Sequence, residues 1–295
     1  MSEDVWESGL EEHQHPFGPA DADAPLPEEV ITVSAMLGWS TAAIQGAAVP
    51  LLVGGFLAWG VNLLASLIAQ FANIGSSVAG AADALPPSME PIIGPLASSA
   101  VTLVAAPVLW VIQAAVLTAA ARYMTRGTSS IDALSPTPSA ILGFVTASII
   151  AFVVQIPFFA LIGIGGYAGW SMGSSTEENI VYAFGGASAV LLITFIPWIY
   201  IMLRLSLATA AAVVEGNGLE GIKASWRLTR RPIVVAHVFA YLFCAAGAGI
   251  LSGLCCFTFG LLNVVIVPFF ASGLMAAYLR ATRNDGTLSE SGFFE

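Results

Sequence analysis

Charged residues are scarce in this chain, and their scarcity indicates its class. Of 295 residues, 9% are charged and 57% are hydrophobic, whereas a typical soluble domain has about 25% charged residues. A soluble fold of this length cannot bury so large a surplus of apolar side chains, so a lipid bilayer must solvate much of the chain. The composition therefore excludes an ordinary soluble protein and predicts an integral membrane protein.

Lysine and arginine are absent from the first 30 residues, which contain nine of the 19 acidic residues. The other ten acids are nearly balanced by nine basic residues, so the net charge of −10 belongs to this segment. A charged segment with few apolar side chains cannot form a core. We expect a disordered acidic cytoplasmic tail at 1–29, a membrane domain at 30–283 and a polar tail at 284–295.

Cysteine and catalytic motifs are also scarce. The three cysteines lie in apolar sequence and do not form the framework of a disulfide-rich secreted domain. The sequence contains no His-Glu zinc motif, no phosphate-binding glycine loop and no Ser-His-Asp candidate. Catalysis needs clustered titratable groups, which the membrane domain almost lacks. We predict no enzymatic activity, no metal or other cofactor, and no nucleic-acid partner.

What the chain has instead is long apolar runs. They predict an all-α protein of six transmembrane helices with short interfacial amphipathic helices before the odd-numbered spans. The fourth run is too long for one straight crossing, so we expect it to extend into the cytoplasm or to kink at Pro197. The predicted spans are 48–73, 96–122, 143–169, 180–214, 233–253 and 260–281, and the interfacial segments are 30–46, 128–142 and 217–231.

The distribution of basic residues predicts the orientation. With the N-terminus inside, eight of the nine basic residues lie in cytoplasmic segments or at the inner ends of spans, and the three outer loops contain none. This pattern follows the positive-inside rule. We predict a protein of the prokaryotic cytoplasmic (inner) membrane with both termini in the cytoplasm. The ninth basic residue, Arg204, lies within the fourth apolar run.

The even-numbered spans resemble one another. Each has a mid-span proline (Pro107, Pro197 or Pro268) followed by a stripe of small residues. We interpret this as three units of the same orientation, each an interfacial segment plus a two-span hairpin. The alternative is that apolar, alanine-rich helices resemble one another through composition alone.

The segment 217–231 is predicted to be the most strongly amphipathic helix. Asn217 can cap its start, Glu220 stands where a capping box would need it, and Pro232 begins the next span. At helical spacing, one face is apolar and suits lipid, and the other suits headgroups. The first face has Leu219, Ile222, Trp226 and Thr229, and the second has Glu220, Lys223, Arg227 and Arg230.

The same region carries a family resemblance. The runs Arg-Leu-Ser-Leu-Ala at 204–208, Val-Val-Glu-Gly-Asn-Gly at 213–218 and Ala-Ser-Trp-Arg-Leu-Thr-Arg at 224–230 resemble a signature of prokaryotic multi-pass membrane proteins. That group is similar to the membrane domain of some glycerophosphoryl diester phosphodiesterases. Ala224 departs from the family's Arg. The resemblance implies six helices with cytoplasmic interfacial helices, and the phosphodiesterase domain itself is absent from the 295 residues.

Arg204 is the strongest candidate for a binding residue. Placing an arginine within a membrane span costs about 2.5 kcal/mol or more in free energy unless the side chain has a partner. It could bind a lipid phosphate or an anionic substrate. Alternatively, it pairs with backbone carbonyls or with Glu215. Four further cations, Lys223, Arg227, Arg230 and Arg231, could recruit anionic headgroups or could serve topology alone.

Two functions fit these features. The leading one is a non-enzymatic multi-pass protein of structural, regulatory or partner-binding type, with a membrane-protein partner or a second copy beside the lipid bilayer. The alternative is a transporter or lipid-handling protein that binds an anionic, phosphate-bearing ligand near Arg204 and the 217–231 helix. A polar cavity at mid-membrane depth would favour transport.

Overall fold

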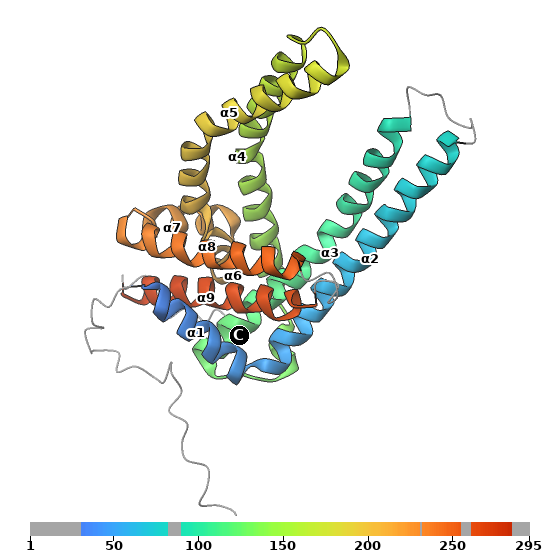
Figure 1. Ribbon diagram of the computed structural model, residues 1–295. Coiled ribbons are helices and arrows are strands. Elements are labelled where there is room, and N and C mark those ends of the chain that lie inside the picture. The colour runs from blue at the N-terminus through green and yellow to red at the C-terminus, as the bar shows by residue number, and fades with distance from the viewer. Residues whose placement is uncertain (1–30, 82–89, 231, 255–260, 285–295) are drawn as a thin grey trace, which may run out of the picture.

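The computed structural model describes residues 31–81, 90–230, 232–254 and 261–284, and this part of the chain is helical and contains no strand (Figure 1). Six of its helices are long and apolar enough to cross a membrane, which confirms the predicted fold class. The elements are α1 Val33–Gly46, α2 Ala48–Ala81, α3 Glu90–Arg126, η1 Ile131–Leu134, α4 Pro138–Trp170, α5 Thr176–Leu205, α6 Ala208–Glu215, α7 Gly218–Leu228, α8 Pro232–Leu254 and α9 Asn263–Asn284. The acidic tail at 1–29 lies outside the described residues.

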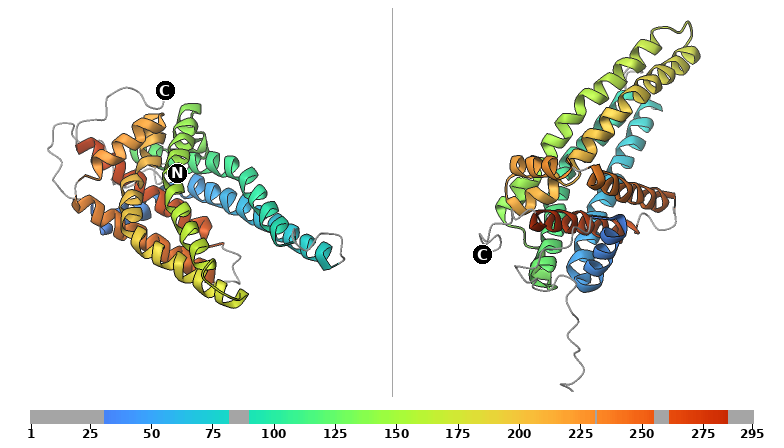
Figure 2. Two further views of the ribbon diagram at one scale, coloured as in Figure 1. Left: turned by 90° about the horizontal axis from the view of Figure 1, so that it is seen from above. Right: turned by 90° about the vertical axis from the view of Figure 1, so that its left-hand side faces the viewer.

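Two long hairpins dominate the shape. Helices α2 and α3 pack along each other, as do α4 and α5, and the two hairpins diverge from a common base (Figure 1). Seen from above, they point in different directions (Figure 2). The third pair differs from the hairpin that the repeat predicts. Helix α9 crosses the base and packs mainly against α1, α2 and α3, and only lightly against α8.

The core lies in the base, where the three repeated stripes of small residues meet. Its buried side chains come largely from the C-terminal half of α3, from α6 and from α9. Small residues let helix backbones approach closely in a membrane protein. A Cβ on Gly55 of α2, for example, would lie 2.0 Å from the carbonyl oxygen of Val264. The stripes therefore mark the packing seam of the base. They include Ala119, Ala120 and Ala121 of α3, Ala210, Ala211 and Ala212 of α6, and Ala276 and Ala277 of α9.

The fourth predicted span is divided into two helices. Helix α5 continues through Pro197 and ends at Leu205, and α6 begins at Ala208. The break therefore falls at Ser206 and Leu207, rather than at the proline. Because α6 is almost entirely buried, it belongs to the base, whereas α5 forms part of the α4–α5 hairpin. Gly216 ends α6 in the left-handed conformation, with φ of 63°.

Helix α7 begins as predicted but packs on a different face. The Asn217 side chain accepts a hydrogen bond from the Leu219 N–H at 3.0 Å. Glu220 accepts one from Lys223 Nζ, rather than completing a capping box. The helix packs against α6 and α4 through a third face of mainly small side chains, which simple apolar-polar periodicity does not reveal. That buried face consists of Gly218, Gly221, Ala224, Ser225 and Leu228.

Candidate anion site at Arg204

Arg204 lies in the last turn of α5, at the point where α7 packs against the hairpin. The final carbonyls of a helix have no partner within it. The Arg204 carbonyl accepts a hydrogen bond from Ser225 Oγ at 2.7 Å, and Thr229 Oγ1 approaches the same oxygen at 3.5 Å. Both hydroxyl groups are buried. These contacts fix α7 on the end of α5 and place Trp226 beside the Arg204 side chain.

Two aromatic rings contact the Arg204 guanidinium. Its Cζ lies 4.9 Å from the centroid of the Tyr200 ring and 5.5 Å from that of the Trp226 ring. Nη2 also donates a hydrogen bond to the Tyr200 hydroxyl at 2.8 Å. Each cation–π contact contributes about 0.5–2 kcal/mol, depending on how far it is shielded from water. The rings therefore supply much of the stabilisation that this arginine needs.

The guanidinium nevertheless retains unused donors. Nε and Nη1 are shielded from solvent and have no hydrogen-bond partner. An unsatisfied buried donor costs about 1–3 kcal/mol, and more when the group is charged. This cost is comparable with the gain from the two rings. Because Nε and Nη1 donate at different edges of the guanidinium, an anion at one edge would remove the cost of the nitrogen that it binds, so the site has capacity for an acceptor.

The predicted alternative pairing of Arg204 with Glu215 is wrong. The Glu215 carboxylate instead accepts a hydrogen bond from the hydroxyl of Tyr278 at 2.5 Å, which links α6 to α9. The helix break provides the physical reason, because α6 follows its own direction into the base and uses Glu215 there. The one ion pair found among the described residues joins Lys223 to Glu220.

The other predicted cations lie on α7 and beside it. Lys223, Arg227 and Arg230 are exposed, and Arg231 lies outside the described residues. The Lys223–Glu220 pair is largely solvent-accessible, so it contributes little to stability. Lys223 lies three residues before Trp226 on α7, where residues three apart are neighbours, and Arg230 lies in the turn that follows the helix. The ring that covers Arg204 therefore has further cations before and after it in the chain.

Two other arginines, like Arg204, contact short segments of the base. Arg122 of α3 donates from Nη1 to the carbonyls of Asp132 and Ala133 in η1, at 3.0 and 3.3 Å. Arg280 of α9 lies over the Trp39 ring of α1, with Cζ 5.8 Å from its centroid. An arginine of the second span thus contacts η1, and an arginine of the fourth span contacts α7, which in each case is the segment that follows. An arginine of the sixth span contacts α1, which precedes the first span.

These contacts were not predicted from the sequence. The residues that could have indicated them are the arginine near the end of each even-numbered span and the tryptophan in two of the interfacial segments. The positive-inside rule explains such arginines through topology alone, so nothing in the sequence required a protein partner.

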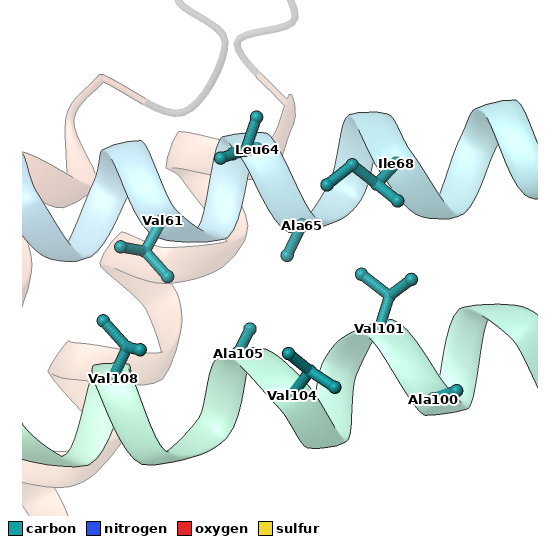
Figure 3. Close-up of a pocket in the computed structure, with 9 residues that line it drawn as sticks. All are labelled: Val61, Leu64, Ala65, Ile68, Ala100, Val101, Val104, Ala105 and Val108. Atoms are coloured by element: carbon teal, nitrogen blue, oxygen red, sulfur yellow. The ribbon is translucent and has the colours of Figure 1, made fainter.

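A separate pocket lies between α2 and α3, and it is aliphatic throughout. It has a volume of about 520 Å³, and side chains from both helices face the space between them (Figure 3). Its lining is Val61, Leu64, Ala65, Ile68, Ala100, Val101, Val104, Ala105 and Val108. An acyl chain suits such a surface, but the pocket is not the polar cavity that the transport hypothesis requires.

Metal ligands do not gather in the described part of the chain, where no group of three His, Cys, Asp or Glu residues is arranged to hold an ion. The acidic segment 1–29 also contains two histidines that could bind a metal, His13 and His15, and they lie outside the described residues. Comparison with family models, with curated proteins and with solved structures finds no match to this chain. The resemblance to the phosphodiesterase membrane domain therefore stays a prediction.

Proposed function

We propose that this chain is a non-enzymatic protein of the prokaryotic cytoplasmic membrane that binds a membrane-protein partner or a second copy of itself. The observation that carries the proposal is the α4–α5 hairpin. Each of its two spans contains a long apolar stretch, and only 6% of the residues in that stretch are buried inside the protein. In the corresponding stretch of α9, 39% of the residues are buried. The hairpin is therefore an arm whose outer surface faces away from the rest of the chain.

The two helices of this arm pack tightly on each other and leave their other faces open. A Cβ on Gly169 would lie 1.9 Å from the Tyr182 carbonyl oxygen, and one on Gly186 would lie 2.2 Å from that of Gly165. Gly163 and Gly185, by contrast, have nothing within 4 Å of a built Cβ. Open glycines are sites where another helix backbone can approach closely, which supports a partner on this arm.

The charge pattern supports the orientation that we propose. Arg126 ends α3 and the basic residues of α7 lie at the same base, so the base faces the cytoplasm if the positive-inside rule holds. The loop between α4 and α5 would then lie outside. The apolar arms would cross the bilayer and present their faces laterally to a partner.

Site-specific photocrosslinking in membranes tests the proposal. Phe184 on α5 and Leu103 on α3 have equal exposed fractions, 73% each, so they form a matched pair for a photoreactive amino acid. We expect a discrete protein adduct from position 184 and a much weaker one from position 103. Native mass spectrometry would then distinguish a second copy from another protein. Lipid adducts alone at both positions, with a monomeric mass, would contradict the proposal.

A further inference from the structure

We propose that the Arg204 guanidinium binds a phosphate group, and that Trp226 is the cover of this site. The inference goes beyond partner binding by the α4–α5 arm, because the site lies at the base where α5 meets α7. It starts from the two buried nitrogens, Nε and Nη1, that have no hydrogen-bond partner. Nε and Nη1 donate at different edges of the planar guanidinium, and each edge pairs one of them with Nη2. Tyr200 accepts from only one of the two Nη2 N–H groups, so one edge stays free to bind two oxygens of a phosphate as a fork.

The backbone around the guanidinium is fixed, whereas its cover is a side chain. Ser225 bonds to the Arg204 carbonyl and holds α7 in place. Trp226 lies over the guanidinium, yet 38% of its own surface is exposed. A rotation of this ring uncovers the donors without moving α7. Tyr200 keeps its hydrogen bond to Nη2, so the guanidinium stays oriented when the ring moves.

The surroundings favour a lipid headgroup as the source of the phosphate. Lys223 lies one turn before Trp226 on α7 and Arg230 lies in the turn after the helix; both are exposed, so they attract an anion towards the cover. Leu219, one turn from Lys223, is an exposed apolar side chain on the same helix. Positive charge beside exposed apolar surface is the arrangement that binds the boundary between headgroups and acyl chains.

Native mass spectrometry of the purified full-length protein provides the test. The probes are phosphatidylglycerol, a diacylglycerol with the same acyl chains, and inorganic phosphate. We expect the protein to retain phosphatidylglycerol at least tenfold better than diacylglycerol. If inorganic phosphate at millimolar concentration displaces the lipid, the site takes free phosphate as well, and if it does not, the headgroup is the ligand. Equal retention of the two lipids would overturn the proposal.

Variants locate the site. Because a hydrogen bond to a charged group is worth a factor of about ten to one hundred in affinity, Arg204→Gln should weaken phosphatidylglycerol binding at least tenfold. Arg204→Lys keeps the charge but loses the fork, so we expect an intermediate loss. Arg126→Gln, an exposed arginine at the same base, is the matched control and should change binding less than about twofold. Equal losses at positions 204 and 126 would show only non-specific attraction and refute the site.

A second measurement uses the unmodified protein, so it does not depend on the folding of a variant. Phosphatidylglycerol with a photoreactive headgroup should label peptides that contain residues 200–204 or 223–230. Labelling confined to other segments would overturn the assignment. The photocrosslinking result at position 184 is independent of this one, so partner binding and phosphate binding can fail separately.

Discussion

Replacing Gly169 by alanine should separate α4 from α5 and so disrupt the arm on which partner binding depends. A Cβ at this position would lie 1.9 Å from the Tyr182 carbonyl oxygen and 2.5 Å from its carbonyl carbon. Non-bonded carbon atoms prefer about 3.5–4.0 Å. Both opposing atoms belong to the backbone, so no side-chain rotation can relieve the contact, and the two helices must move apart.

The cost can be bounded from general values. Forcing an extra methyl group into a packed interface costs about 1–3 kcal/mol. Gly163 on the same helix offers the matched control, because nothing lies within 4 Å of a Cβ built there. In open space, glycine to alanine gains about 0.8–1 kcal/mol of helix propensity. Gly169 is also a residue of α4, so this gain applies to both variants and cancels, and they should differ by roughly 1–3 kcal/mol in the free energy of unfolding.

Thermal unfolding in detergent, followed by tryptophan fluorescence, measures this difference. One kcal/mol corresponds to about 2–4 °C in Tm for domains of 150–250 residues, so Gly169→Ala should melt roughly 2–12 °C below Gly163→Ala. Disulfide trapping between α4 and α5 would confirm that their separation has increased. Equal melting temperatures for the two variants would refute the close backbone packing, and with it the tight arm.

Three further predictions concern the base and the topology. Tyr278→Phe should lower stability by about 1.5–3 kcal/mol in the same melting assay, because it removes a hydrogen bond to the Glu215 carboxylate; Glu215→Gln, which keeps an acceptor, should cost less. Gly216→Ala should cost about 1–2 kcal/mol, because φ of 63° disfavours a Cβ. In a chain without native cysteines, Met172→Cys should react with an impermeant thiol reagent from outside, and Lys223→Cys only after permeabilisation. The reverse labelling would overturn the orientation.

The sequence was sufficient to predict the long helices and the start of the short helix α7, because these depend on local chemistry. Asn217 caps α7 and Pro232 begins α8, as their residue types indicate. The packing face of α7 could not be predicted in the same way. Gly218, Gly221 and Ala224 carry almost no hydrophobic signal, yet they allow the closest approach: a Cβ on Gly221 would lie 2.5 Å from the Ala212 nitrogen.

The sequence predicted that Arg204 belongs to the candidate site, but it did not predict that Trp226 contacts the Arg204 side chain. An arginine in an apolar run signals a site through its cost alone, so Arg204 stood out without any knowledge of the fold. Its contact with Trp226 depends on the break at Ser206 and Leu207, which directs the chain through α6 and returns it as α7. The sequence left open an extension of this run into the cytoplasm or a kink at Pro197, because the proline is the local signal that the run offers. The direction of α9 across the base likewise depends on contacts far apart in sequence.

Anchoring alone does not explain the chemistry at position 204. Arg122 donates to two carbonyls of η1, and Arg280 lies over Trp39, so in both cases the arginine holds a short segment of the base. At Arg204 the holding is done largely by the backbone, since Ser225 bonds to the carbonyl and not to the side chain. The guanidinium is thus not required for that hydrogen bond, and it retains two buried nitrogens without a partner. The Arg204 side chain thus costs free energy and has more hydrogen-bond donors than its contacts within the protein use. A ligand that accepts hydrogen bonds from these donors best explains it.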